Sequence, residues 1–233
     1  MLFRSGSGNW NILEFSPDSK KAYVSSTVIG AGKIAELDLL TFTHTRDIPF
    51  SSDSPHGLHV SSDGTILYAT AQSSNYITKI HLDDLSTDNV MLGGSGPHQV
   101  EFSSDDSTYY VSCQSTNEVR VFKASTDQFI TSIPVGVYPQ EMELSELNPF
   151  LYVTCTEDPG SPNQKGSVYV INYITNQVVT HIYTGYQPHG IDVDDEHGMV
   201  YVANLNYDTN GPPPHHITDC GGKNGYISII DMS

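Results

Sequence analysis

Residues 94–135 read GSGPHQVEFSSDDSTYYVSCQSTNEVRVFKASTDQFITSIPV, and this stretch decides the fold. It contains four short runs rich in β-branched and aromatic residues, separated by Ser, Asp, Asn and Thr. Apolar and polar residues alternate over residues 118–122, which is the period of a half-buried strand. The stretch therefore predicts four short antiparallel strands joined by turns, and the rest of the chain repeats this unit.

A proline step opens each repeat of the unit. It recurs 42, 42 and 49 residues apart, at Pro55, Pro97, Pro139 and Pro188. A repeat of about 40–50 residues with four strands indicates β-propeller blades, which stack radially because one blade cannot bury its own faces. We predict an all-β β-propeller of four-stranded antiparallel blades, in a single domain over residues 1–233. The five visible blades span approximately residues 10–50, 51–93, 94–135, 136–185 and 186–233.

Three short segments repeat a Tyr-Val or Pro-His signature: YVTC at residues 152–155, PHGI at residues 188–191 and YVAN at residues 201–204. In these segments the chain resembles the YVTN-repeat, YncE-like β-propeller family. The resemblance implies seven blades, whereas the fifth blade here is incomplete and stops in its third strand at residues 226–231. We therefore expect a fragment of a seven-bladed propeller, with a closed five-bladed ring as the alternative.

The same resemblance implies an exported protein, so we expect the periplasm or the cell surface. Residues 1–30 contain no signal segment. Residues 1–9 make a poor strand and look like translated adapter sequence, so we expect them to be non-native or disordered.

The charge balance excludes some partners. Lys and Arg number 10 against 27 Asp and Glu, which gives a net charge of −17. Such a surface repels phosphate backbones and anionic membranes. Nucleic acid is therefore an unsuitable partner, although some YncE-like proteins are associated with DNA binding. No apolar run approaches the 18 residues that indicate a membrane span. We expect a monomer that binds a protein, a glycan or a small molecule.

Two loops are longer than their counterparts in other blades. Residues 157–166 and residues 206–225 both connect the second strand to the third. In a four-stranded blade this loop lies on the same face as the Pro-His steps, and loops that lengthen on one face of a repeat scaffold usually form the binding face. Our leading interpretation is a non-catalytic binding or scaffold protein that uses this face; neutral drift of a surface loop is the alternative.

Aligned blades place two rings of polar residues near the axis. The first ring is Asn11, His56, His98, Gln140 and His189; the second, three residues further on, is Glu14, His59, Glu101, Glu143 and Asp192. Buried carboxylates need water, shared protons or a cation. The cofactor is unknown: Ca²⁺ would suit the carboxylates, Zn²⁺ or Cu²⁺ would suit the imidazoles, and a water-filled polar channel needs no ion.

The long loop of the fifth blade carries further metal-competent side chains, namely His215, His216 and Cys220. Their spacing fits no standard site, so a structural cap over the channel is the alternative to a metal site. Cys113 and Cys155 occupy the same position in adjacent blades, and we predict that they are buried as small apolar residues.

A hydrolase is the competing class of function. The segment GSGPH at residues 94–98 is similar to a Gly-Pro-Arg-His step of lactonase-type propellers, but it lacks the arginine. The chain has no GxSxG or phosphate-binding GxxxxGK[ST] motif. A lactonase-like hydrolase and a metal-binding or redox propeller are therefore the alternatives to a binding protein.

Overall fold

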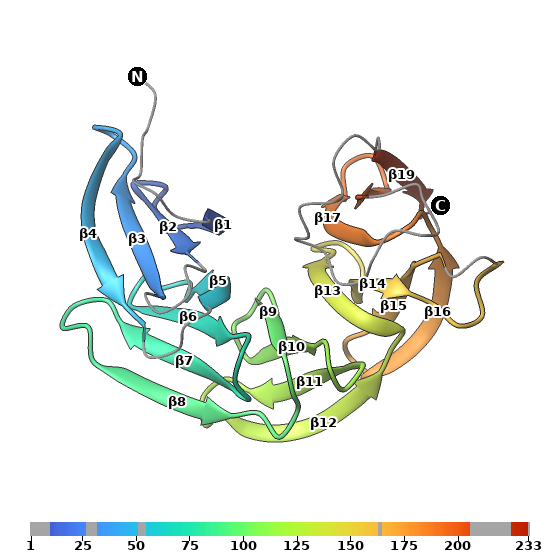
Figure 1. Cartoon of the computed structure of the whole chain (residues 1–233), viewed down its shortest axis with the longest axis horizontal. Helices are drawn as coiled ribbons and strands as arrows, with labels where there is room; N and C mark the ends of the chain where they lie inside the picture. Colours follow the sequence, from blue (N-terminus) through green and yellow to red (C-terminus); the bar gives the residue numbers. More distant parts are fainter. Residues whose placement is uncertain (1–9, 27–31, 51–54, 163–164, 206–224, 233) are drawn as a thin grey trace.

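The computed structural model describes residues 10–26, 32–50, 55–162, 165–205 and 225–232. Its strands form five antiparallel sheets (Figure 1). Blade 1 comprises β1 (Trp10–Phe15), β2 (Lys21–Ser26), β3 (Lys33–Asp38) and β4 (Thr43–Pro49). Blade 2 comprises β5 (Pro55–Val60), β6 (Ile66–Ala71), β7 (Tyr76–His81) and β8 (Thr87–Met91). Blade 3 comprises β9 (Pro97–Phe102), β10 (Thr108–Cys113), β11 (Glu118–Lys123) and β12 (Gln128–Pro134).

Blade 4 comprises β13 (Val137–Leu144), β14 (Phe150–Glu157), β15 (Ser167–Asn172) and β16 (Gln177–Tyr183). Blade 5 has three strands among the described residues: β17 (Pro188–Asp194), β18 (Met199–Asn204) and β19 (Tyr226–Asp231). The prediction of an all-β propeller with four-stranded blades and an incomplete fifth blade is therefore confirmed.

The blades follow one another along a curved arc (Figure 1). The first strand of each blade lies on the inner side of the arc, and β4, β8, β12 and β16 form its outer rim. Neighbouring blades pack through these inner strands, as β5 does against β9 and β13 does against β17. An opening separates blade 1 from blade 5, so the described strands do not close into a ring. Within the described ranges, no helix is long and apolar enough to cross a membrane.

A β-bulge follows the proline of the inner strand in blades 2, 3, 4 and 5. In blade 2, Pro55 pairs with Ala71 and Leu58 pairs with Ala69, so two residues of β5 lie opposite the single residue Thr70 of β6. A bulge of this kind leaves one backbone group without a ladder partner and bends the strand. The same irregularity recurs after Pro97, Pro139 and Pro188. Each repeat therefore builds its inner strand in the same way.

A hydroxyl group opposite the bulge joins blade 2 to blade 3, blade 3 to blade 4 and blade 4 to blade 5. Thr70 Oγ1 accepts a hydrogen bond from the Gly57 N–H (2.8 Å) and donates one to the carbonyl oxygen of His98 in blade 3 (2.8 Å). Ser112 and Thr154, at the same position in blades 3 and 4, donate to the carbonyl oxygens of Gln140 and His189, each at 2.7 Å. These bonds satisfy backbone groups that a bulge would otherwise leave unpaired in a dry interior.

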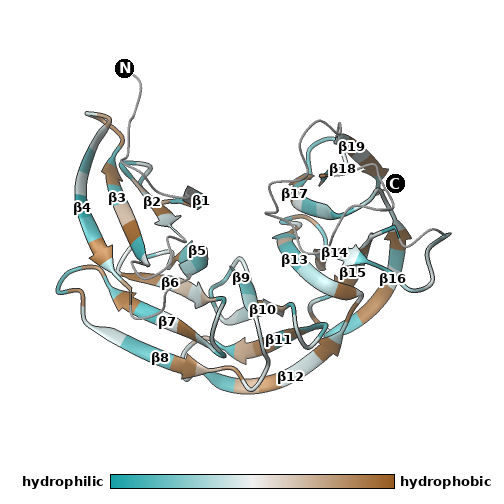
Figure 2. Cartoon of the chain, viewed as in Figure 1, coloured by the Kyte–Doolittle hydropathy of each residue, from teal (hydrophilic) through white to brown (hydrophobic). Residues whose placement is uncertain are grey.

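Apolar side chains from adjacent blades form the core. Between blades 3 and 4, for example, Tyr110 and Val119 pack with Met142 and Leu151, and all four are fully buried or nearly so. Figure 2 shows hydrophilic stretches along the inner strands β5, β9, β13 and β17. The apolar core therefore lies between the sheets, and the inner strands carry the hydrophilic stretches.

The two cysteines in the described ranges belong to this core. Cys113 and Cys155 are completely buried and carry free thiols. Burial raises the pKa of the Cys113 thiol to about 12 and also raises the pKa of the Cys155 thiol. Both are therefore poor nucleophiles, because the thiolate is the reactive form of cysteine.

Candidate functional site

The first ring lies where the inner strands begin. A Cβ atom built on Gly57 would lie 2.4 Å from the carbonyl oxygen of His98 and 2.6 Å from the Cα atom of Gln99. The glycine after His56 therefore permits β5 and β9 to approach more closely than a side chain would allow. As a result the rings of His56 and His98 lie with their centroids 3.8 Å apart, with 1% and 0% of these residues exposed.

Two members of the first ring differ from the histidines. The side chain of Gln140 is fully engaged: its Oε1 accepts from Gln114 Nε2 (3.2 Å), and its Nε2 donates to Thr156 Oγ1 (3.0 Å) and to the Tyr138 carbonyl (3.1 Å). Gln140 therefore links backbone and side chains rather than facing a ligand. Asn11, on β1, is half-buried and lies outside the group of close-lying side chains described next.

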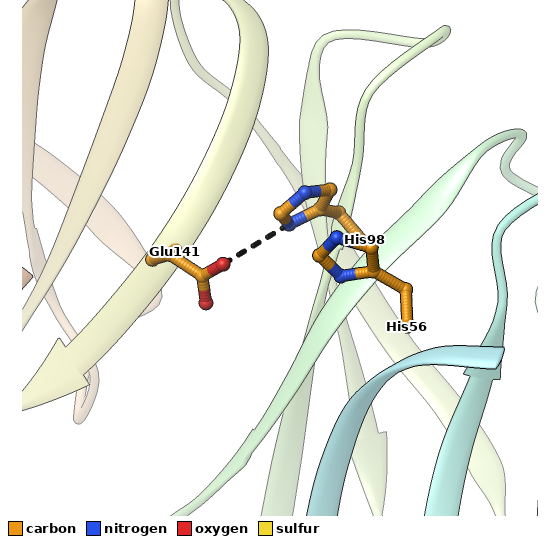
Figure 3. Close-up of side chains that lie close together, drawn as sticks. All are labelled: His56, His98 and Glu141. Atoms are coloured by element: carbon orange, nitrogen blue, oxygen red, sulfur yellow. Dashed lines mark ion pairs between the residues drawn. The ribbon is translucent and has the colours of Figure 1, made fainter. Parts of the chain in front are cut away.

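Glu141 is a site residue that the sequence reading missed. It follows Gln140 on β13, is 9% exposed, and points toward the two imidazoles (Figure 3). Its Oε1 lies 3.6 Å from His98 Nδ1 and 3.8 Å from Nδ1 of His189, and it accepts no hydrogen bond from the described residues. Burial, with a contribution from Glu143, raises the pKa of the Glu141 carboxyl group to about 8.

Metal-ligating atoms of three residues converge at this point. One ligand atom each from His56, His98 and Glu141 lie within 4.8 Å of one another. Among the described residues this is the sole group of three or more His, Cys, Asp or Glu side chains that meets such a limit. His189 stands beside the group, its ring centroid 5.4 Å from that of His98.

The second ring lies at the other end of the inner strands, near the turns between first and second strands. There a recess of about 270 Å³ opens between blades 2, 3 and 4. Three members of the second ring line it, together with backbone and side-chain groups of the adjacent turns: His59, Val60, Ser62, Glu101, Phe102, Ser103, Ser104, Asp106, Glu143, Leu144, Ser145 and Glu146. The two rings therefore serve opposite ends of the inner strands.

The imidazole in the recess is neutral at physiological pH. Burial lowers the pKa of His59 to about 4, although the nearby Asp106 carboxylate acts in the opposite direction. The ring stacks on Phe102 with centroids 4.5 Å apart and an interplanar angle of 13°. The uncharged His59 ring therefore forms part of the wall of the recess and adds no positive charge to it.

The carboxyl groups around the recess repel one another. Burial raises the pKa of Glu101 well above its usual range, and the charges of Glu143 and Glu14 raise it further. Burial, with a contribution from Asp192, raises the pKa of Glu143 to about 7. The pKa of Glu14 is also raised to about 7 by burial, opposed by a hydrogen bond of 3.2 Å from the Val60 N–H. No Lys or Arg is among the residues that line the recess.

The oxygen atoms of these carboxyl groups are spread around the recess and do not converge on one point. The close-lying group described above contains no member of the second ring, so the oxygen atoms of Glu14, Glu101 and Glu143 do not converge as ligands of one small ion do. Asp192 is exposed and acts on Glu143 through its charge.

The long loops lie largely outside this description. His215, His216 and Cys220 belong to residues 206–224, which are outside the described residues, and so do residues 163 and 164 of the other long loop. Where that loop in blade 4 is described, its two sides pair, with the Asp158 N–H donating to the Lys165 carbonyl oxygen at 3.0 Å.

Comparison with known proteins shows the fold. No family model matches the chain, and no curated protein matches it in sequence. A chain of Kuenenia stuttgartiensis hydrazine synthase superposes with a TM-score of 0.79 at 19% identity, covering 100% of this chain and 67% of that one. The chain is a β-propeller. Its resemblance to the YVTN-repeat, YncE-like group stays a prediction.

Two further solved structures show the same fold at low identity. The Cps50 (Swd1) β-propeller domain of Myceliophteria thermophila matches with a TM-score of 0.69 at 12% identity, covering 88% of this chain and 65% of that domain. A protein of unknown function from Desulfotomaculum acetoxidans DSM 771 matches with a TM-score of 0.72 at 13% identity, covering 100% and 78%. The chain spans about two thirds of the length of two of these three structures.

Proposed function

We propose that this chain is a non-catalytic binding propeller that holds a positively charged organic group in the recess between blades 2, 3 and 4. The observation that carries the proposal is a recess of about 270 Å³ bordered by carboxylates, with no Lys or Arg in its lining. Carboxylates with no cationic partner are unfavourable in a partly dry site, and a bound cation offsets that cost.

The shape and chemistry of the recess support an organic cation. Phe102, Val60 and Leu144 supply apolar wall, and the neutral His59 ring extends it. Glu143 supplies negative charge at pH 8, and Glu101 supplies a second carboxyl group, whose raised pKa a bound cation would lower. Ligand sites typically combine apolar walls with a few placed polar groups. A primary ammonium group on a short alkyl chain matches both the carboxyl groups and the apolar walls of the recess. Such a group is found in a small amine or in a lysine side chain of a partner protein.

The arrangement of the carboxylates favours this ligand over a bare Ca²⁺ ion. A Ca²⁺ ion binds its oxygen ligands at about 2.3–2.6 Å, which requires the oxygen atoms to converge on one point. The oxygen atoms of the second ring do not converge in this way. An ammonium group with a stem can instead reach separated carboxylates on different blades.

Binding without turnover is supported by the hydroxyl groups near the recess. Ser103 Oγ donates to Asp105 Oδ1 at 2.7 Å within its own turn, and Ser145 Oγ donates to Asp195 of the neighbouring turn. Both hydroxyl groups therefore donate hydrogen bonds that stabilise turns. The proposed location outside the cytoplasm rests on the family resemblance alone.

The test uses 1,5-diaminopentane as the probe and pentane-1,5-diol as its neutral counterpart of similar length. Isothermal titration calorimetry of the whole chain at pH 8 and low salt is expected to show binding of the diamine and none of the diol. Binding should weaken as salt is added, because salt screens charge pairs that water can reach. Glu101→Gln should weaken binding by about tenfold or more, since about 1.4 kcal/mol corresponds to a factor of ten.

Glu196→Gln is the matched control, because it makes the same chemical change at an exposed turn position outside the recess. Equal affinity for diamine and diol, or parent-like affinity in Glu101→Gln, would refute the proposal. A calcium titration that saturates at one ion per chain and is lost in Glu101→Gln would support the compact-ion alternative instead.

A further inference from the structure

The geometry points to a second site, at the opposite end of the inner strands: we propose that His56, His98 and Glu141 bind a divalent transition-metal ion of the Zn²⁺ class. The three residues come from three different blades, on β5, β9 and β13 (Figure 3). The site would therefore fasten three neighbouring blades at their inner edges. It shares no side chain with the amine recess.

The distances suit a metal ion better than direct hydrogen bonds. Bonds of about 2.0–2.1 Å from Zn²⁺ place adjacent ligand atoms of a tetrahedral ion roughly 3.3–3.4 Å apart. The Glu141 Oε1 atom lies 3.6 Å from His98 Nδ1, too far for a good hydrogen bond and a few tenths of an ångström wider than such a pair of ligands. One ligand atom from each of the three residues already lies within 4.8 Å of the others.

Burial makes the group unusual for side chains with no bound ion. His98 is completely buried, His56 is 1% exposed and Glu141 is 9% exposed. The Glu141 Oε1 atom accepts no hydrogen bond from the described residues, although it points at the imidazoles. Nearly all buried polar atoms in proteins have a hydrogen-bond partner or bind an ion or water. A metal ion would give this oxygen a partner.

The donor set selects the class of metal. Two imidazole nitrogens and one carboxylate oxygen suit Zn²⁺ and its neighbours in the transition series, whereas Ca²⁺ and Mg²⁺ prefer oxygen donors alone. Three protein ligands leave a tetrahedral ion with a fourth position. His189 lies close to the three ligands, with its Nδ1 3.8 Å from the same Glu141 oxygen and its side chain partly exposed.

The surrounding backbone holds the ligands in place before any metal binds. The carbonyl oxygens of His98 and His189 accept hydrogen bonds from Thr70 and Thr154, and the Glu141 N–H donates to Thr154 Oγ1 at 3.1 Å. A site whose ligands are already positioned loses less conformational entropy on binding. The inner-strand bulge and its hydroxyl therefore serve the metal site directly.

The test titrates the whole chain, previously treated with a chelator, with Zn²⁺ alone. Calorimetry is expected to show one tight Zn²⁺ per chain, and the melting temperature should rise with added Zn²⁺ because the ion binds only the native state. Glu141→Gln should weaken Zn²⁺ binding by about tenfold or more, and the double variant His56→Gln, His98→Gln should abolish the tight phase. In the parent chain, Co²⁺ should give the intense visible absorption of a tetrahedral ion.

His81→Gln is the matched control, because His81 lies in the same blade as His56 but on β7, where its side chain is exposed and pairs with Asp88. Parent-like Zn²⁺ affinity in the double histidine variant would overturn the assignment by placing the ion elsewhere, and so would less than about 0.1 Zn²⁺ per chain. Displacement of Zn²⁺ by a comparable concentration of Ca²⁺ would overturn the choice of donor class. If the double variant fails to fold, Glu141→Gln decides the question, since it conserves the shape of the side chain.

Discussion

Replacing Glu14 with glutamine should stabilise the protein above neutral pH and leave it nearly unchanged in mild acid. Glu14 lies on β1 with 28% of its side chain exposed, and its Oε1 accepts a hydrogen bond of 3.2 Å from the Val60 N–H of blade 2. A glutamine Oε1 can accept the same bond. The substitution therefore removes the charge and keeps the contact between blades.

The magnitude follows from the pKa of the carboxyl group. Burial raises the pKa of Glu14 from 4.5 to about 7, in spite of the bond from Val60. An acid whose pKa is raised on folding contributes stability that is complete below its unfolded pKa and is lost as pH rises through the folded value. At about 1.4 kcal/mol for each unit of pKa, the rise from 4.5 to about 7 gives about 3.5 kcal/mol as an upper bound. Between pH 4.5 and pH 8 the parent loses this contribution and Glu14→Gln does not.

Urea denaturation at pH 4.5, 6, 7 and 8 measures the difference in unfolding free energy between parent and variant. The difference should be near zero at pH 4.5 and grow to at most about 3.5 kcal/mol at pH 8. The exposed Glu196, changed to glutamine, should give a difference that stays nearly flat with pH. A flat profile for Glu14→Gln, or a parent that is the more stable protein at pH 8, would refute the reasoning.

Three further substitutions test contacts between and within the blades. Gly57→Ala should cost about 1–3 kcal/mol, because its Cβ would lie 2.4 Å from a backbone oxygen of the next blade, whereas Gly190→Ala should be tolerated with its nearest contact at 3.7 Å. Thr70→Val should cost about 1–3 kcal/mol by leaving two backbone groups without partners. Arg46→Met should cost a few kcal/mol at pH 7 and less near pH 3, because protonated Glu36 needs no guanidinium partner.

The last of these predictions depends on the sign of the Glu36 shift. Burial, the largest influence, raises the pKa of Glu36, but hydrogen bonds from Arg46, Thr45 and Lys21 outweigh it and lower the pKa overall. The stability from this pair is therefore present above pH 4.5 and is lost as pH falls through the lowered pKa. Urea melts at both pH values check it, and melts at pH 7 check the other two. Equal losses for Gly57→Ala and Gly190→Ala, a neutral Thr70→Val, or a cost of Arg46→Met that does not change with pH would each contradict the stated cause.

The repeat made the fold predictable from sequence. The proline step and the Tyr-Val strand recur at a spacing that suits a four-stranded blade, and each copy repeats the same local signals. Aligning the copies also predicted that His56 and His98 share a ring, and the structure brings their side chains into contact. The recess near Glu101 could not be predicted from the sequence, because its shape depends on how neighbouring blades pack against one another.

Glu141 was missed for a physical reason. Strict alternation along β13 places the residue after Gln140 on the opposite face of the sheet from Gln140. The bulge breaks this alternation, because Pro139 pairs with Cys155 and Met142 with Val153, which sets two residues of β13 against Thr154 alone. A polar residue at the second position of a bulge is the signal that could have identified Glu141.

The same bulge explains how one repeated unit produces a site at a single place. The second bulge position is glycine at 57 and 190, glutamine at Gln99 and glutamate at Glu141. Glycine at 57 permits the close approach of two blades, and Gln99 accepts a hydrogen bond from the Met142 N–H of the next blade. Only at residue 141 among these four does the position carry an ionisable group, and there it meets imidazoles contributed by the blades on either side. The repeat therefore provides the same backbone geometry at each of these four bulges. The glutamate at position 141 provides the negatively charged ligand of the proposed metal site.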